Sequence, residues 1–187
     1  AANTTLSRSK PIVSVSITYR DRPIRAQVIQ PPAVDGSFAI SLRFFADLPL
    51  GQIKLAYLFG SERSLEGLRR KRNAELRDVV ATGDIDAAIG FCVVHKLNMI
   101  VSGGTSTGKT VTARKILSFV PERERIITIE EAAELRPEQP NVVTLISDRD
   151  EETRSADVLL TSTLRMRPDR IVLGEVRGKE AMTFLEA

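Results

Sequence analysis

The chain has 187 residues, with 27 Lys or Arg against 24 Asp or Glu, so its formal net charge is 27 − 24 = +3. With 42% hydrophobic and 27% charged residues, the composition is that of an ordinary globular protein. A single Cys, Cys92, excludes a disulfide framework, and no apolar run reaches the ~20 residues that span a bilayer. Disulfide-rich secreted, fibrous, collagenous and membrane-spanning classes are therefore excluded, and so small a net charge does not by itself indicate nucleic-acid binding.

Three short strands are predicted within residues 1–45. Apolar and polar residues alternate over 13–19, 24–28 and 38–44, which is the period of half-buried strands. Pro31-Pro32 and Asp35-Gly36 supply the break between the second strand and the third. Because three short strands are too few for an independent fold, residues 1–45 are interpreted as the end of a small β-rich N-terminal domain.

Two arginines, Arg25 and Arg43, fall on the polar faces of neighbouring predicted strands. Arginines in such positions are most often solvated surface residues. An anion close by would favour a second interpretation, because the guanidinium group matches the geometry of phosphate. The strand pattern alone leaves both interpretations open.

Residues 46–83 are interpreted as a basic helical linker. Six Lys or Arg residues stand among three acids within 62–77. A basic run of this kind is typical of a solvated helix face, although acidic lipid headgroups or a partner subunit would also bind it.

From Asp84 onward, helices and strands alternate, and residues 84–187 are predicted to form an α/β domain with a mainly parallel sheet. Asp84 is the predicted N-cap of a helix over 85–93. Strands are predicted at 98–102, 126–129, 142–146 and 171–173. Further helices are predicted at 111–120, around 152–164 and from near Lys179.

A glycine-rich segment, Gly103-Gly-Thr-Ser-Thr-Gly-Lys-Thr110, matches the G-x-x-x-x-G-K-[ST] pattern of a phosphate-binding loop. Glycines let the backbone N–H groups converge on an anion, and the helix that follows adds its positive dipole end. Lys109 would place its charge at the β- and γ-phosphates, and Thr110 would offer its hydroxyl to Mg²⁺. A chance Gly/Ser/Thr-rich turn is the alternative, but the predicted strand before the loop and helix after it favour nucleotide binding.

Hydrolysis also needs carboxylates, and two candidates follow apolar strands. Glu175 comes after the strand at 171–173, and Glu130 comes after the strand at 126–129. In α/β folds, ligand sites form at the carboxyl ends of the strands, although acids there also serve as helix caps or surface charges. Arg177, two residues beyond Glu175, would bind phosphate or form an interface salt bridge. His95 has no second ligand at metal-binding spacing, and Cys92 is interpreted as packing.

Three segments together resemble the secretion-superfamily traffic ATPases, most closely the VirB-type ATPases of type IV secretion systems. Type II secretion and pilus motors share the same plan. The resemblance is specific over 84–187 and weaker over 12–45. The segments are the phosphate loop with Ser102 before it, Ile127-Thr-Ile-Glu-Glu-Ala-Ala-Glu-Leu135, and Leu164-Arg-Met-Arg-Pro-Asp-Arg-Ile-Val-Leu-Gly-Glu-Val-Arg-Gly178.

The resemblance implies a RecA-like P-loop domain that binds ATP and Mg²⁺ and hydrolyses ATP to power substrate export or pilus assembly. It implies a hexameric ring, peripheral at the cytoplasmic face of the bacterial inner membrane. The partners would be other secretion-system ATPases and inner-membrane channel components, without sequence-specific nucleic-acid binding. The implied catalytic residues are Lys109, Glu130 and Glu175, and the implied metal ligands are Thr110 and Glu175. The implied nucleotide contacts are Gly103, Gly104, Thr105, Ser106, Thr107, Gly108, Lys109, Thr110, Val111, Arg25 and Arg43.

Within those roles, Glu130 would orient or deprotonate the attacking water, and Glu175 would act through metal-bound water. Arg25 and Arg43 would contact the terminal phosphate. The sequence departs from the family in two places. It has Glu130-Glu131-Ala132 where the family often has Glu-Asp-Thr, and it contains no Thr-Gly-His segment. The domain at 84–187 is therefore expected to be truncated. An assembly module that binds nucleotide with little hydrolysis is the alternative function, and a small-molecule kinase is a weaker third.

Overall fold

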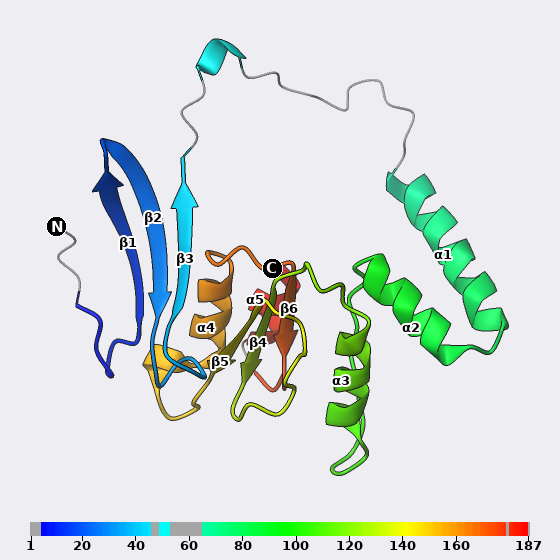
Figure 1. Cartoon of the computed structure of the whole chain (residues 1–187). Helices are drawn as coiled ribbons and strands as arrows, with labels where there is room; N and C mark the ends of the chain where they lie inside the picture. The colour runs from blue at the N-terminus through cyan, green and yellow to red at the C-terminus, as the bar shows by residue number, and fades with distance from the viewer. Residues whose placement is uncertain (1–4, 46–48, 53–64, 179, 187) are drawn as a thin grey trace. The chain divides into compact units, whose positions relative to one another are not determined.

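The computed structural model describes residues 5–45, 49–52, 65–178 and 180–186, and the chain forms two compact units (Figure 1). The first unit combines residues 1–45 with residues 121–187. The second consists of residues 46–120. The units thus follow a different division from the predicted domains 1–45, 46–83 and 84–187, and that division stays a prediction.

An antiparallel sheet opens the first unit. β1 (Ile12–Tyr19), β2 (Arg22–Ile29) and β3 (Ala39–Phe44) pair in the order β1-β2-β3, which confirms the three predicted strands. Arg20 and Asp21 form the turn between β1 and β2 with φ of 49° and 60°. Positive φ at both residues of a two-residue turn gives the twist that a tight hairpin needs.

The parallel sheet of the same unit consists of β4 (Ile126–Glu130), β5 (Val142–Ile146) and β6 (Arg170–Leu173), in the order β5-β4-β6. All five residues of the central strand β4 are buried, as expected for a strand covered on both faces. The parallel arrangement predicted from the alternating helices and strands is confirmed, and β4 extends one residue further than predicted, to include Glu130.

The predicted helix around 152–164 is two elements, the 3-10 helix η2 (Glu152–Arg154) and α4 (Ala156–Thr163). The reason is Ser155, whose hydroxyl accepts a hydrogen bond from the Val158 N–H at 3.4 Å and so begins a new helix. The last helix is α5 (Glu180–Glu186), close to the predicted start near Lys179.

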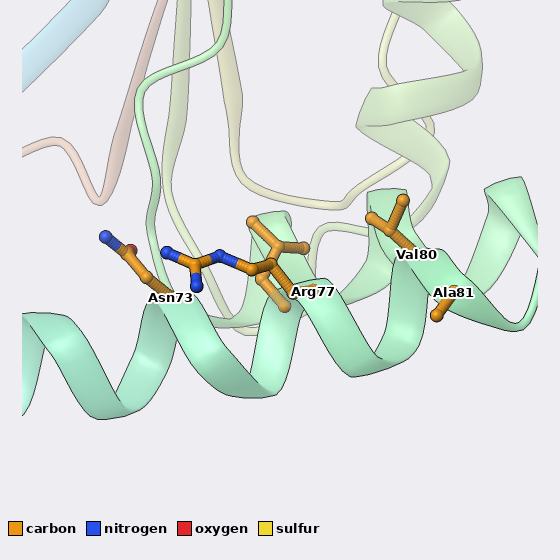
Figure 2. A pocket seen from close by; sticks show the side chains of 5 residues that line it. Asn73, Arg77, Val80 and Ala81 are labelled. Atoms are coloured by element: carbon orange, nitrogen blue, oxygen red, sulfur yellow. The ribbon is translucent and has the colours of Figure 1, made fainter.

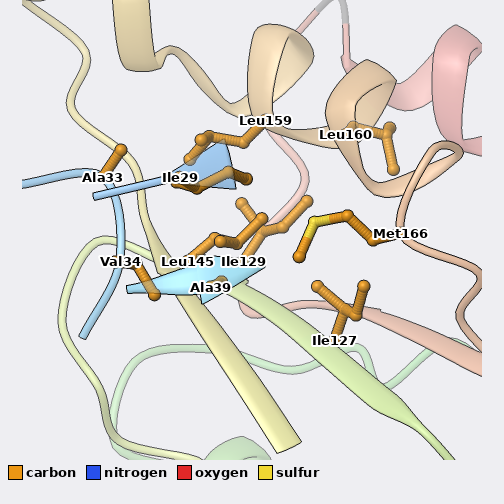
Figure 3. Packing of buried hydrophobic residues seen from close by; sticks show 10 residues of the cluster. All are labelled: Ile29, Ala33, Val34, Ala39, Ile127, Ile129, Leu145, Leu159, Leu160 and Met166. Carbon is orange, nitrogen blue, oxygen red and sulfur yellow. The ribbon is translucent and has the colours of Figure 1, made fainter. Parts of the chain in front are cut away.

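One hydrophobic core joins the two sheets of the first unit (Figure 3). Ile29 and Ala39, from β2 and β3, pack with Leu145 of β5 and with Leu159 and Leu160 of α4. All five are at most 5% exposed. The end of the antiparallel sheet is therefore fixed to the α/β layers by burial of apolar side chains.

The opposite face of the antiparallel sheet carries an exposed apolar surface, formed on β3 by Ile40, Leu42 and Phe44 and hereafter called the β3 apolar face. These side chains are 56%, 49% and 66% exposed. The predicted alternation in β3 is therefore correct, but its apolar side is the exposed one. Ala39 and Ser41, on the other side, are buried and half-buried.

In its described residues, the second unit is helical. It contains the 3-10 helix η1 (Leu50–Gln52), α1 (Leu65–Ala81), α2 (Ile85–Val94) and α3 (Lys109–Ser118). Asp84 caps α2 as predicted, because its side chain accepts a hydrogen bond from the Ala87 N–H at 2.9 Å. An ion pair of 2.7 Å between Asp86 and Lys115 links α2 to α3. Across the described residues, the structure contains no helix both long and apolar enough to cross a membrane.

The strand predicted at 98–102 is wrong. The structure gives these residues no regular secondary structure, and Ile100 is 88% exposed. A strand is stabilised by hydrogen bonds to a neighbouring strand, and the described part of the second unit contains helices only. The apolar composition of 98–102 predicted the strand, but the described residues of its unit include no strand with which it could pair.

Candidate nucleotide-binding site

The phosphate loop leads directly into α3, which begins at Lys109, two residues earlier than predicted. Gly108 is the N-cap of α3 and has φ of 85°, a backbone conformation that favours glycine. A Cβ on Gly103 would lie 2.6 Å from Oγ1 of Thr107, closer than real atoms approach. Two of the motif's glycines are therefore required by the shape of this loop.

The N-terminus of α3 is open. Gly108 offers no side-chain cap, and residues 103–110 are all exposed. The first N–H groups of a helix have no partner within the helix, and together with the helix dipole they favour an anion. The loop is held from within, since the Thr107 hydroxyl donates to the Gly104 carbonyl at 2.9 Å. The Lys109 ammonium donates to the same carbonyl.

Glu130 is the last residue of β4 and is only 5% exposed. Its Oε2 accepts hydrogen bonds from the backbone N–H groups of Glu134 and Leu135, each at 2.9 Å. Its Oε1 is buried and receives no hydrogen bond from any described residue. One carboxylate oxygen thus holds the loop after β4, and the other remains available as an acceptor.

Gly174 packs closely against the side chain of Glu130. A Cβ there would lie 3.1 Å from Cγ of Glu130, and the Gly174 N–H donates to the carbonyl of Ile129 at 2.9 Å. The strand-end Gly174 before Glu175 therefore serves close packing of β6 on β4.

Glu175 lies just beyond the end of β6, exposed, between two arginines. It forms ion pairs with Arg177 and, at 3.3 Å, with Arg149. Arg149 also pairs with Glu131. Arg177 forms a salt bridge with Glu175 of the same chain, a partner that differs from the phosphate and the interface partner predicted for it.

Arg149 pairs with the candidate site residue Glu175, and sequence reasoning did not single it out. The three parallel strands β4, β5 and β6 are followed by Glu131, Arg149 and Glu175, so all three charges lie at the carboxyl edge of one sheet. That edge is where α/β ligand sites form. The sequence signal for Arg149 is its position three residues after the end of β5.

Arg25 and Arg43 lie directly opposite each other in the pairing of β2 with β3, which confirms that they share one face. Both guanidinium carbons are 5.6 Å from the ring centroid of Phe45. No described carboxylate forms an ion pair with either arginine.

The predicted site residues divide between the two units. Residues 103–111 belong to the second unit, whereas Arg25, Arg43, Glu130 and Glu175 belong to the first. Sequence reasoning that treats the chain from residue 84 as one domain does not anticipate this division.

The donor atoms fit a metal ion that arrives with phosphate. No group of three or more Asp, Glu, His or Cys side chains that could hold a metal occurs in the described residues. Mg²⁺ commonly takes one or two protein ligands and completes its shell with phosphate oxygens and water. The exposed hydroxyl of Thr110, in the first turn of α3, suits that arrangement. Glu175 fits less directly, because two arginines already neutralise it.

A surface hollow runs along α1 in the second unit (Figure 2). It is lined by Asn73, Leu76, Arg77, Val80 and Ala81. None of these residues belongs to the predicted site, so the hollow is separate from the candidate nucleotide site.

The fold and the loop define an α/β protein with a glycine-rich anion loop at a helix N-terminus. Comparison with known families is consistent with this class, because residues 70–187 match the family described as Type II/IV secretion system protein. The chain belongs to that family, and within it to the VirB-type traffic ATPases that its motifs resemble.

Individual relatives show how far the likeness extends. Protein VirB11 of Rhizobium radiobacter is 34% identical over 170 residues, covering 86% of this chain and 50% of the relative. Type IV secretion system protein VirB11 of Bartonella quintana is 31% identical over 197 residues, covering 96% and 54%. The chain thus spans about half the length of these relatives.

The likeness extends to three dimensions. The crystal structure of the VirB11 ATPase from the Brucella suis type IV secretion system, in complex with sulphate, superposes with a TM-score of 0.74 at 27% identity. The match covers 98% of this chain and 56% of that structure. The two chains therefore share their architecture over nearly all of the present sequence.

Proposed function

We propose that the chain binds ATP through residues 103–111 and is part of an ATP-hydrolysing traffic ATPase. That ATPase would power substrate export or pilus assembly in a bacterial type IV secretion system. The observation that carries the proposal is the open N-terminus of α3 behind a loop whose shape requires Gly103 and Gly108. Membership of the secretion family supports it.

Three residues have proposed parts in binding the phosphates and the metal: Lys109, Thr110 and Glu175. The Lys109 ammonium, which now rests on the Gly104 carbonyl, would turn to the β- and γ-phosphates. Thr110 would hold Mg²⁺, which when bound neutralises phosphate charge. Glu175 would support the metal's water shell once one of its arginines is released.

Glu130 is proposed to orient the attacking water. Its buried Oε1 supports this role, because an unpaired carboxylate oxygen can accept a proton or a hydrogen bond from water. Its Oε2 would continue to accept hydrogen bonds from the two backbone N–H groups, which would keep the side chain in place.

Arg25 and Arg43 are proposed to bind the terminal phosphate of the nucleotide. Two guanidinium groups on one sheet face suit a phosphate better than a single cation does. The anion named for the Brucella suis structure, sulphate, is of the same tetrahedral class. Contacts to a phosphate that is lost on hydrolysis would be made in one state only, which is what a switch requires.

A Lys109→Ala substitution tests the nucleotide site. Losing a charge-assisted contact to phosphate should weaken ATP binding about ten- to hundred-fold in the whole protein, measured by isothermal titration calorimetry. Lys115→Ala is the matched control, since Lys115 lies in the same helix and pairs with Asp86. Equal ATP affinity in the Lys109→Ala and native proteins would refute the assignment.

An assembly module with little or no hydrolysis is the second candidate. The engagement of Glu175 by two arginines favours it, because each carboxylate oxygen is already in an ion pair. Phosphate release by the native protein and by Glu130→Gln separates the two functions. Equally negligible rates would support the module, and a native rate well above that of the variant would support the ATPase.

The assembly is proposed from the family. We infer a homohexameric ring of RecA-like domains at the cytoplasmic face of the inner membrane, in contact with other secretion ATPases and channel components. Residues 1–45 would be the end of its N-terminal domain. Matches to proteins named for type IV secretion support this setting.

A further inference from the structure

Phe45 is in contact with both arginines of the antiparallel sheet. The guanidinium carbons of Arg25 and Arg43 each lie 5.6 Å from its ring centroid. The chain explains why. Phe45 follows Arg43 by two residues and so points to the same side, and it is diagonal to Arg25, which pairs with Arg43 across β2 and β3. Diagonal neighbours are within reach of aromatic and long side chains.

The Phe45 ring offsets the repulsion between Arg25 and Arg43. Two like charges directly opposite each other in a sheet repel. The negative face of an aromatic ring attracts a guanidinium group, and here one ring serves two. Among residues the structure describes, no carboxylate pairs with either arginine, so Phe45 is the partner that the structure shows for both.

The kind of partner matters for an anion site. A carboxylate would hold the arginines together but would also neutralise them and compete with phosphate. An uncharged ring orients the two groups and leaves their charge intact. Arg25 and Arg43 are themselves exposed, as is Phe45, so an anion can reach the pair.

We propose that Phe45 is a positioning residue that holds Arg25 and Arg43 as a preformed pair for the terminal phosphate. This inference rests on the proposed function, which assigns the two arginines to that phosphate. Holding the pair in advance lowers the ordering cost of two long side chains on binding. The effect should therefore appear with a nucleoside triphosphate and vanish with a diphosphate.

The test is Phe45→Leu in the whole protein, with ATP and ADP affinities measured by calorimetry. Loss of two cation–π contacts should weaken ATP binding about five- to thirty-fold and leave ADP binding unchanged. Phe45→Tyr keeps a ring of similar face and should restore ATP affinity. Phe44→Leu is the matched control, because Phe44 is the preceding residue and belongs to the β3 apolar face.

Arg25→Ala and Arg43→Ala distinguish the inference from the function beneath it. If they weaken ATP but Phe45→Leu does not, the positioning role is wrong and the phosphate assignment stands. If neither arginine variant changes the ATP-to-ADP ratio, both are wrong. Equal losses of ATP and ADP affinity in Phe45→Leu would indicate a general disturbance and overturn the positioning role.

A double-mutant cycle completes the test. In an Arg25→Ala/Arg43→Ala background, Phe45→Leu should have no further effect on ATP affinity, because the ring then has nothing to hold. An additional loss in that background of the same size as in the native protein would overturn the inference.

Discussion

At the scale of single residues, Glu130 combines two demands on one carboxylate. One carboxylate oxygen accepts hydrogen bonds from two backbone N–H groups, and the other has no hydrogen-bond partner among the described residues. A buried acceptor with spare capacity is unusual in a folded protein and calls for an explanation. Holding the loop at 131–135 explains the role of Oε2, and the proposed contact to the attacking water would explain the unpaired Oε1.

Two substitutions separate these demands. Glu130→Gln keeps an amide oxygen for the two N–H groups, so the free energy of unfolding should stay near native while phosphate release falls. Glu130→Ala leaves both N–H groups unpaired and should cost roughly 1–3 kcal/mol in stability as well. Urea denaturation and a phosphate-release assay give the two measurements. A native release rate in Glu130→Gln would mean that Glu130 is structural only.

Residue-scale prediction from the sequence worked where spacing alone decides geometry. The strand period placed Arg25 beside Arg43. It did not find Arg149 or Phe45. Arg149 pairs with Glu131, which follows a different strand, and Phe45 lies beyond the end of its strand and contacts Arg25 of the neighbouring one. Nor did it show that Glu130 is buried, since burial depends on the layers packed around β4.

At the scale of elements, local signals placed most helices and strands. Asp84 and α2 agree with the prediction, as do the three strands of each sheet. The failures share a cause. The segment 98–102 has the composition of a strand but no pairing partner in its unit, and 152–164 divides at a serine cap. Whether a segment pairs as a strand, and where a cap begins a helix, depends on residues that are close in space. The sequence pattern does not show which residues these are.

The start of α5 gives an element-scale prediction on pH. Burial alone raises the pKa of Glu180, but hydrogen bonds from the N–H groups of Arg177, Glu180 and Gly178, with the charge of Arg149, outweigh it and lower the pKa below its ordinary 4.5. The folded state therefore holds this proton less tightly than the unfolded state. Its stabilisation is present above pH 4.5 and is lost as pH falls through the folded pKa.

Glu180→Gln should remove this contribution. The variant should be less stable than the native protein at pH 7, and the difference should shrink as pH falls below 4.5 toward the lower folded pKa. Thermal unfolding followed by circular dichroism across pH 3–7 measures it. Glu152→Gln, an exposed acid in η2, is the control. A stability difference that does not change with pH would contradict the assignment to the carboxylate.

At the scale of the molecule, the β3 apolar face is the surface with the clearest consequence. Exposed apolar side chains on an edge strand favour association, and natural edge strands are often protected by lysine. Ile40, Leu42 and Phe44 offer no such charge. The 187-residue chain should therefore bind apolar dyes and self-associate as its concentration rises.

Leu42→Lys should weaken both effects. A charge in the middle of the β3 apolar face should reduce 1-anilinonaphthalene-8-sulfonate fluorescence several-fold and lower the concentration dependence of light scattering. Thr18→Lys, an exposed position on the polar side of β1, adds the same charge elsewhere and should change neither. A similar reduction in both variants would point to net charge instead of the apolar surface.

The first unit is built from two separate segments of the chain, and this affects the order in which it can fold during synthesis. Its two pieces, residues 1–45 and 121–187, share a core although residues 46–120 separate them along the chain. At a ribosome's pace of about 5–20 residues per second, β1–β3 would emerge roughly 5–20 s before Leu145 and roughly 6–23 s before Leu159. Ile29 and Ala39 would stay uncovered in that interval, which makes the nascent N-terminal sheet a natural substrate for a chaperone.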